Sequence, residues 1–262
     1  MIAVDLDRIE AAVRRYLDDA QLVDGLSVVH RRGGGRGAIL RAPLGEGRTV
    51  IVKIWKLNRG RDSLKRLMWM SNTRREWRVH CRLYAAGVRV PQPLAYRAGR
   101  RPQGPYELIV VEDLGRITNG LSYLKDCLRR DDQSAIADLE REVIANTVRM
   151  VRSGVLDIDN KLNNFGITAA GELYRFDLEC ARRWRFGRLP DEDFGAMMGH
   201  LVCSHAFACQ PNLARTEDFA RRLVEALQPQ PAVLAAGRSS VERILRRQKE
   251  RSGLDSRLML PW

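Results

Sequence analysis

The feature that most constrains this chain is one lysine inside an apolar run. Residues 49–55 read Thr-Val-Ile-Val-Lys-Ile-Trp, so Lys53 is surrounded by β-branched and aromatic neighbours. Such a run is typical of a strand that is buried in a sheet. Because an ammonium group is rarely buried without an opposite charge, the fold has to bring a carboxylate to Lys53 from another element.

The next helical pattern contains a suitable carboxylate. Residues 74–87 end at a glycine, as helices commonly do, and contain Glu76 as their only acidic residue. We predict that Glu76 pairs with Lys53. We expect the apolar stripe of this helix to consist of Trp77, Cys81 and Tyr84. The alternative is an edge-strand lysine that extends to solvent, together with a solvent-facing glutamate.

A polar loop in residues 157–167 carries a second pattern. Asp159 and Asn164 are five positions apart with Lys161 between them, and Asp177 follows thirteen positions after Asn164, at the end of a short strand pattern. This order is similar to the catalytic loop and the metal-binding aspartate of kinases. The similarity implies that Asp159, with Lys161, acts on the acceptor hydroxyl, and that Asn164 and Asp177 bind a metal ion. The alternative is that these residues only occupy turns.

Two further segments fit nucleotide binding in a kinase-like chain. A glycine-rich turn, which lets backbone N–H groups approach phosphates closely, contains Gly33, Gly35 and Gly37. Its spacing does not match the G-x-G-x-x-G of protein kinases, and a flexible hairpin is the alternative. Residues 106–115 form a buried strand pattern that runs into a polar turn. Glu112 and Leu114 lie there at the position of a kinase hinge, which holds adenine through its backbone.

The order of these motifs resembles the protein-kinase-like superfamily, and within it the bacterial lipopolysaccharide kinases that phosphorylate core heptose or Kdo. The resemblance extends over about residues 25–200. Three segments are particularly similar to that family: the basic stretch after the strand lysine, the Arg-Arg-Glu-Trp start of the helix, and the Asn-Asn-Phe-Gly-Ile end of the loop. The sequence departs from the superfamily pattern in two places. Asp157 replaces the histidine of the His-x-Asp triplet, and Leu178 and Glu179 follow Asp177 in place of Phe-Gly.

The resemblance implies an α+β, protein-kinase-like fold with two lobes. Residues 1–115 would form a small antiparallel β N-lobe, with a leading helix that the apolar spacing in residues 7–22 predicts. Residues 116–262 would form a helical C-lobe with the catalytic loop and a basic tail. ATP and Mg²⁺ would be the cofactors, with Lys53, ordered by Glu76, at the α- and β-phosphates.

The reaction that the resemblance implies is phosphorylation of a sugar hydroxyl of the lipopolysaccharide inner core. One alternative is a small-molecule or RNA-directed kinase of the same fold. Another is a pseudokinase that acts as a membrane-associated binding module.

The charge balance favours polyanionic partners. The chain has 45 Lys plus Arg against 32 Asp plus Glu, a net charge of +13, and charge alone does not distinguish an anionic membrane or glycan from nucleic acid. Basic residues alternate with apolar ones in residues 57–70 and again in residues 241–262. This pattern is typical of helices at a membrane surface, or of solvated helices with one packed face. In the first segment the basic residues include Arg59, Arg61, Lys65 and Arg66.

Four arginines follow Asp177, namely Arg182, Arg183, Arg185 and Arg188. Their guanidinium groups either hold phosphate or carboxylate on a glycan or form a solvated basic loop.

The five cysteines are scattered, odd in number and without CxxC spacing, so we expect neither a disulfide framework nor a zinc site. In residues 191–209 a helical pattern contains four residues that we interpret as core, namely His200, Cys203, His205 and Cys209. Acidic residues interrupt the first positions and no run is long enough to span a bilayer, so we expect neither a secretory signal nor a membrane span. The expected location is the cytoplasm, peripheral on the cytoplasmic face of the inner membrane.

Overall fold

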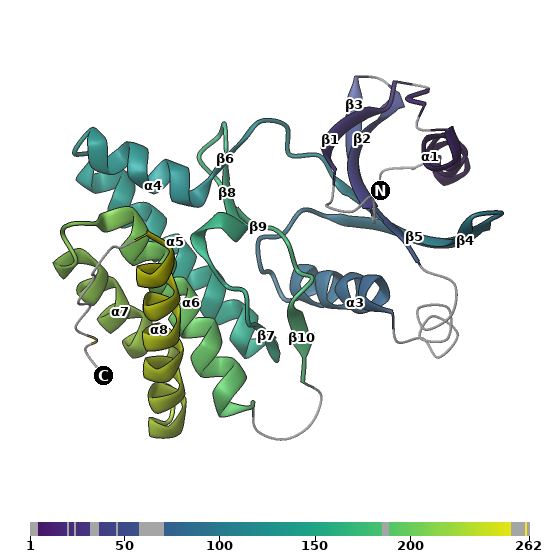
Figure 1. Ribbon diagram of the computed structural model, residues 1–262. Helices are drawn as coiled ribbons and strands as arrows, with labels where there is room; N and C mark the ends of the chain where they lie inside the picture. Colours follow the sequence, from purple (N-terminus) through teal and green to yellow (C-terminus); the bar gives the residue numbers. More distant parts are fainter. Residues whose placement is uncertain are drawn as a thin grey trace. The chain divides into compact units, whose positions relative to one another are not determined.

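The computed structural model describes residues 5–19, 21–23, 25–31, 37–45, 47–57, 71–184, 189–252 and 260. The chain divides into two compact units. One consists of Met1–Tyr84 and Pro91–Leu114, and the other of Ala85–Val90 and Gly115–Trp262. The first unit is built on a β-sheet and the second mainly on helices (Figure 1).

In the described residues, the first unit forms a five-stranded antiparallel sheet in the order β1-β2-β3-β5-β4. Its elements are α1 (Leu6–Asp19), β1 (Ser27–Arg31), β2 (Gly37–Gly45), β3 (Arg48–Lys56), α3 (Asn72–Ala85), β4 (Pro93–Arg101) and β5 (Gly104–Glu112). Lys53 lies on the central strand, opposite Ile39 of β2 and Ile109 of β5. The alternative of an edge-strand lysine is therefore wrong.

The two faces of β3 have different neighbours because side chains alternate along a strand. Val50, Val52 and Ile54 are buried on one face, whereas Lys53 points to the other. The apolar face shares a core cluster with residues of α1, including Val13. The predicted leading helix is thus present as α1, and it covers the sheet face opposite Lys53.

Polar contacts attach α1 to the sheet. The Tyr106 hydroxyl donates to Glu10 Oε1 at 2.5 Å and accepts from Arg14 Nε at 2.9 Å. Arg101 donates to a carbonyl in the last turn of α1 at 3.0 Å. Gly99 provides space for the ring of Tyr106, because a Cβ at this position would overlap with the ring. The leading helix is therefore an integral part of the first unit.

Helix α3 buries a different face from the one that its apolar residues suggest. The predicted stripe of Trp77, Cys81 and Tyr84 is wrong, since Tyr84 is 45% exposed and Trp77 and Cys81 are only partly buried. The buried residues are Thr73, Glu76, Val79, His80 and Leu83. The buried face is rotated by about one residue because it includes Glu76, whose carboxylate contacts Lys53.

The second unit consists of helices and short strands. Its elements are β6 (Ile117–Asn119), α4 (Gly120–Arg129), α5 (Gln133–Arg152), β7 (Val155–Asp157), η2 (Leu162–Asn164), β8 (Phe165–Thr168), β9 (Leu173–Arg175), β10 (Ala181–Arg183), α6 (Asp191–Cys209), α7 (Ala214–Leu227) and α8 (Pro231–Ser252). The short strands form antiparallel sheets in the orders β6-β8-β9 and β10-β7. These sheets border the polar loop, because β7 precedes it and β8 follows it.

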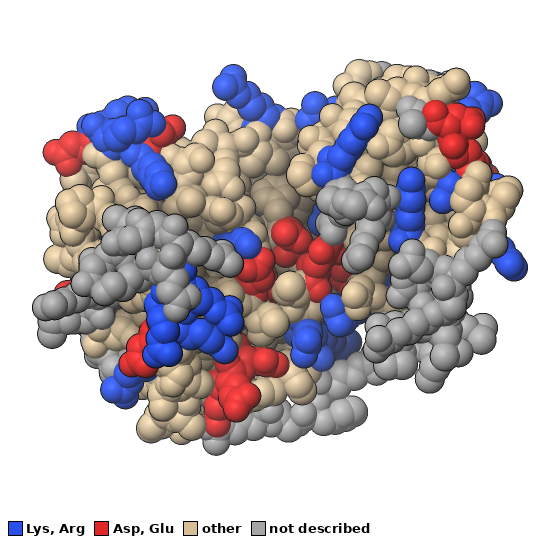
Figure 2. All heavy atoms as spheres, in the orientation of Figure 1, with Lys and Arg blue, Asp and Glu red and all other residues tan. Residues whose placement is uncertain are grey.

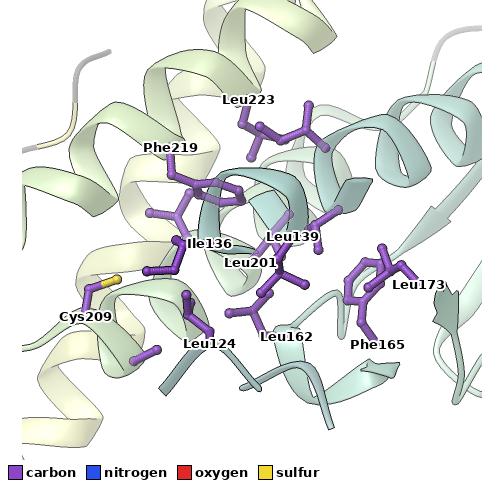
Figure 3. Packing of buried hydrophobic residues seen from close by; sticks show 14 of the residues in the cluster. Leu124, Ile136, Leu139, Leu162, Phe165, Leu173, Leu201, Cys209, Phe219 and Leu223 are labelled. Atoms are coloured by element: carbon purple, nitrogen blue, oxygen red, sulfur yellow. The ribbon is translucent and has the colours of Figure 1, made fainter. Parts of the chain in front are cut away.

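The core of the second unit lies between α5, α6 and α7. Leu139, Leu201 and Phe219 belong to these three helices and to one buried cluster, which Figure 3 shows from close by. Leu162 of η2 and Phe165 of β8 belong to the same cluster. The segment that follows Lys161 is therefore anchored in the core by its apolar side chains. None of the described helices is long and apolar enough to cross a membrane.

Helices α6 and α8 approach each other closely through small residues. A Cβ at Gly195 would lie 2.5 Å from the Gly237 nitrogen, and a Cβ at Gly199 would lie 2.9 Å from the Ser240 Cβ. Glycine at these positions removes the side chains that would keep the two backbones apart. Almost every residue of α6 after its first turn is buried, which makes α6 the central helix of this unit.

A buried carboxylate joins α5, α6 and α7. Glu140 Oε1 accepts hydrogen bonds from His205 Nε2 at 3.0 Å and from Arg215 Nε at 2.9 Å, and Glu140 Oε2 accepts one from Arg222. Burial favours a higher pKa for Glu140, but the bonds from His205, Arg222 and Arg215 outweigh it and lower the pKa to about 2. Since a carboxylate only accepts, His205 carries its proton on Nε2 and accepts from Thr216 at Nδ1.

We predict that Glu140→Gln makes the protein less stable at pH 7 and flattens its acid denaturation. The folded pKa of about 2 lies below the ordinary value of 4.5, so Glu140 contributes stability above about pH 4.5 that is lost as the pH falls toward 2. This shift corresponds to about 3 kcal/mol. Urea unfolding at pH 7 and pH 3 measures it.

Glu142→Gln is the matched control on the same helix. The Glu142 side chain is 34% exposed and its ion pair with Arg89 has an N to O distance of 3.5 Å, so its loss should change stability by less than about 1 kcal/mol. An equal effect of both substitutions at pH 7 would contradict a special role of the buried carboxylate.

Candidate active site

The predicted ion pair of the first unit is present. Lys53 Nζ lies 2.8 Å from Glu76 Oε1, and the two side chains are 12% and 1% exposed. Lys53 is held by the central strand β3, and Glu76 lies near the start of α3. A pair this buried is sensitive to the loss of either partner, because the remaining charge would have no counter-ion.

His80 lies one turn after Glu76 and connects α3 to the segment before β4. His80 Nε2 lies 2.7 Å from the Pro91 carbonyl, and since a carbonyl only accepts, this nitrogen carries the proton. Burial, followed by the nearby charge of Lys53, lowers the pKa of His80 to about 4. His80 is therefore neutral at pH 7 and does not compete with Lys53 for Glu76.

The hinge segment is fixed to the first unit through its side chains. Glu112 exchanges two bonds with Gln92: its N–H donates to the Gln92 carbonyl at 2.9 Å, and its Oε2 accepts from the Gln92 N–H at 3.1 Å. Asp113 accepts from Arg41 Nε at 2.5 Å and from the Thr49 hydroxyl at 2.6 Å. The Glu112 N–H is therefore already used within the first unit, and the roles of Glu112 and Leu114 at a nucleotide base stay a prediction.

The glycine turn is described only in part. Gly37 begins β2 and pairs with Trp55 of β3, which places it at the start of the hairpin strand next to the one with Lys53. Gly33 and Gly35 lie outside the described residues, and their role at phosphates stays a prediction.

In the second unit, the loop residues gather around Asp159. Lys161 Nζ contacts both carboxylate oxygens, at 3.0 and 2.8 Å, and the Asn164 side-chain amide donates to the Asp159 carbonyl at 2.8 Å. Contact with His200 is the largest cause that lowers the pKa of Asp159 to about 2; burial opposes it, and Lys161 and Asn164 add to the lowering. Asp159 is therefore an ionised and partly exposed carboxylate at neutral pH.

Asn164 and Asp177 fit a small divalent cation by their chemistry. The amide nitrogen of Asn164 is committed to Asp159, which leaves its oxygen as the atom to bind a cation. Asp177 has an exposed side chain and a φ of 52°, and the N–H of its neighbour Phe176 donates to the Asn164 carbonyl at 2.7 Å. An amide oxygen and a carboxylate are ligands that suit Mg²⁺. Their role as metal ligands stays a prediction.

A buried arginine, which the sequence interpretation missed, supports this loop. Arg175 is fully buried and donates to Asn146 and Thr147 of α5 and to Asn160 of the loop, at 3.0, 3.2 and 2.8 Å. It also lies 3.6 Å from Asp157 Oδ2. The available signal was a lone cation in an apolar strand pattern, the same signal that identified Lys53.

The interpretation of His200 as a core residue is wrong. Its side chain is 33% exposed and its Nδ1 lies 3.7 Å from Asp159 Oδ1. The other three members of that group, Cys203, His205 and Cys209, are buried. One turn after His200, Ser204 Oγ accepts a hydrogen bond from the Leu162 N–H at 2.9 Å. Sequence spacing gave no signal for these contacts, because the loop and α6 are distant in the chain.

Basic side chains near the loop and on the last helix are exposed. Arg182 and Arg183 are exposed on β10, whose partner strand β7 ends at Asp157; Arg185 and Arg188 lie outside the described residues. Figure 2 shows Lys and Arg side chains gathered over α8. The exposed arginines of this helix, among the side chains that the structure describes, are Arg238, Arg243, Arg246 and Arg247.

A sheet unit with a paired strand lysine and a helical unit with an Asp-Lys-Asn loop define a phosphotransferase of the protein-kinase fold. The fold is similar to that of the ROP18 kinase domain in complex with AMP-PNP and sucrose, with a TM-score of 0.50 and 13% identity over 93% of this chain and 95% of that chain. It is also similar to the Toxoplasma gondii specific rhoptry antigen kinase domain, with a TM-score of 0.52 and 12% identity over 94% of each chain. The predicted fold is confirmed.

Sequence comparison places the chain more narrowly. The profile of the Lipopolysaccharide kinase (Kdo/WaaP) family matches residues 32–201, which include both clusters described above. The chain belongs to this family, as the sequence resemblance predicted. No curated protein matches it significantly. Family and fold together support a kinase, an enzyme class that generally uses ATP and a divalent metal ion.

We predict that Lys53→Met lowers the rate of phosphoryl transfer by about 100-fold or more, because it removes a charge that we expect to lie at the phosphates. It should also destabilise the protein by about 3 kcal/mol, since Glu76 stays buried without its partner. Adding Glu76→Gln should restore most of the stability and none of the activity. Thermal unfolding and ATP turnover of the two variants measure these effects separately. A Lys53→Met protein with near-parent turnover would rule out this role.

We predict different outcomes for the aspartates of the loop. Asp159→Asn should abolish transfer with little change in stability, because the side chain is 29% exposed. Asp177→Ala should abolish transfer and also weaken Mg²⁺-dependent ATP binding. Asp157→Asn should mainly change stability and leave transfer largely intact, because it alters the buried pair with Arg175 and not the carboxylate of Asp159. Titration calorimetry, activity and unfolding distinguish the three. If Asp157→Asn were inactive and Asp159→Asn active, Asp157 and not Asp159 would be the residue that acts on the acceptor hydroxyl.

Proposed function

We propose that this chain is an ATP-dependent kinase that phosphorylates a sugar hydroxyl of the lipopolysaccharide inner core. The observation that carries the proposal is the ionised carboxylate of Asp159, which accepts from Lys161 while the Asp159 backbone carbonyl accepts from Asn164, in a chain that belongs to the lipopolysaccharide kinase family. A partly exposed carboxylate in this setting can accept a proton from an alcohol that approaches it.

In the proposed reaction each cluster has a defined task. Lys53, ordered by Glu76, binds the α- and β-phosphates of ATP, and the backbone near Leu114 binds the base. Asn164 and Asp177 would hold Mg²⁺, which would neutralise negative charge on the phosphates. Asp159 orients the acceptor hydroxyl and takes its proton as the oxygen bonds to the γ-phosphorus. The bond from that phosphorus to the β–γ bridging oxygen breaks in the same transfer, and ADP leaves with the electron pair. Catalysis then consists mainly of positioning and charge neutralisation.

The segment after Asp177 supports a non-peptide acceptor. Only a short connection separates β10 (Ala181–Arg183) from α6 (Asp191–Cys209), and the sequence lacks the Ala-Pro-Glu of a protein kinase's peptide platform. The exposed arginines of β10, Arg182 and Arg183, are suited to phosphate or carboxylate groups on a glycan. These features favour an anionic sugar over a peptide.

The positive charge of the chain favours binding to an anionic membrane surface. We propose that this surface is the cytoplasmic face of the inner membrane. The exposed arginines of α8 would each contribute about 1 kcal/mol of attraction near an anionic lipid surface. The basic segment with Arg59, Arg61, Lys65 and Arg66 is proposed for the same role from sequence alone, because it lies outside the described residues.

The test is phosphoryl transfer by the full chain from ATP to purified lipopolysaccharide whose core has been dephosphorylated. We expect Mg²⁺-dependent incorporation of one phosphate into the core sugars, detected by mass spectrometry and absent with Asp159→Asn. A deacylated core fragment should be phosphorylated with a higher KM and a similar kcat, because it lacks attraction to the membrane surface.

Two other results of this test would each favour a different function. ATP binding without transfer to either acceptor, and without hydrolysis, would point to a pseudokinase that acts as a binding module. Turnover of ATP without incorporation into lipopolysaccharide would point to a different, soluble acceptor such as a small molecule or RNA.

A further inference from the structure

One face of α6 contacts the catalytic loop at two points. Ser204 Oγ accepts a hydrogen bond from the Leu162 N–H at 2.9 Å and donates to the Leu201 carbonyl at 2.8 Å. One turn earlier, His200 Nδ1 lies 3.7 Å from Asp159 Oδ1. Because residues four apart lie on the same side of a helix, His200 and Ser204 together face the loop from Asp159 to Leu162.

The two nitrogen groups beside the Asp159 carboxylate are held very differently. Lys161 contacts both oxygens, but it belongs to the same loop and its long side chain is 37% exposed. His200 belongs to a helix of 19 residues that is buried on most of its surface. Contact with Lys161 therefore connects Asp159 only to its own loop, whereas contact with His200 connects it to the central helix.

This difference matters because phosphoryl transfer depends mainly on positioning. A displacement of a catalytic group by about 1 Å can lower a rate by about 100-fold. Groups that are fixed to rigid helices hold their geometry better than groups on loops.

We propose that His200 is a positioning residue for phosphoryl transfer, whose Nδ1–H holds Asp159 Oδ1 in place to meet the acceptor hydroxyl. The proposal rests on the proposed role of Asp159 as the group that takes the acceptor proton. It requires a hydrogen on Nδ1, because a carboxylate only accepts. The separation of 3.7 Å is longer than a hydrogen bond, and such contacts commonly shorten when substrates bind.

The test compares three substitutions that differ in where a donor remains. His200→Leu removes the donor, His200→Asn keeps one at the atom that corresponds to Nδ1, and His200→Gln keeps one at the position of Nε2. We expect kcat for transfer to dephosphorylated lipopolysaccharide to fall roughly 10- to 100-fold in His200→Leu and His200→Gln. His200→Asn should stay within about threefold of the parent, and KM for ATP should change less than about twofold in all three.

His30→Leu is the matched control, because it removes an exposed imidazole from β1 of the first unit. It should leave kcat unchanged. Equal losses in His200→Asn and His200→Leu would overturn the proposal, as would a parent-like kcat in His200→Leu. If His200→Leu unfolds, the comparison of kcat between His200→Asn and His200→Gln still tests the proposal, since both variants keep a polar side chain at this site.

A second measurement does not depend on the acceptor. Amide hydrogen exchange across residues 159–164 should become faster in His200→Leu and stay close to the parent in His200→Asn. Unchanged exchange in His200→Leu contradicts the positioning role. Failure of the parent protein to phosphorylate lipopolysaccharide contradicts only the proposed acceptor, and slow ATP hydrolysis then replaces transfer as the rate that is compared among the variants.

Discussion

The buried guanidinium of Arg175 is the interaction on which the active-site part of the second unit depends. A cation with no exposed surface is stable only if its donors are satisfied and a counter-charge lies near. Its acceptors come from α5 and the catalytic loop. The Arg175 Cζ lies over the ring of Phe165, 4.3 Å from the ring centroid. Helix α5, the loop, β8 and β9 must therefore assemble together. The loop geometry around Asp159 follows from that assembly.

The same interaction accounts for the departure from the His-x-Asp pattern. Asp157 stands where the superfamily has histidine, and it lies fully buried beside Arg175. Burial raises the pKa of Asp157 to about 6, against the attraction of Arg175, and burial lowers the pKa of Arg175 to about 10. Because both shifts follow desolvation, the pair organises the loop more than it stabilises the protein. Asp157 also accepts the Asp159 N–H at 3.2 Å, which links the pair to the proposed base.

The fold was predicted from the resemblance to the protein-kinase-like superfamily, and the ion pair of Lys53 and Glu76 was predicted from a local pattern. A buried strand lysine needs one carboxylate, and the following helix has only one. The buried face of α3 was predicted wrongly because Glu76 was counted as a solvent-facing polar residue. Glu76 is buried, since it pairs with Lys53, which is itself mostly buried. His200 could not be predicted, since its contact with Asp159 arises from the packing of α6 against a loop about forty positions earlier.

Among the proposed site residues that the structure describes, Asp177 is the one with a left-handed backbone, at a φ of 52°. Glycine adopts this conformation freely, whereas an aspartate there costs on the order of 1 kcal/mol. A chain that served only as a scaffold would gain stability by replacing this residue, because nothing in its packing requires an exposed carboxylate. The aspartate at this position thus lowers the free energy of unfolding slightly, and its proposed bond to a metal ion would offset that cost whenever the ion is bound.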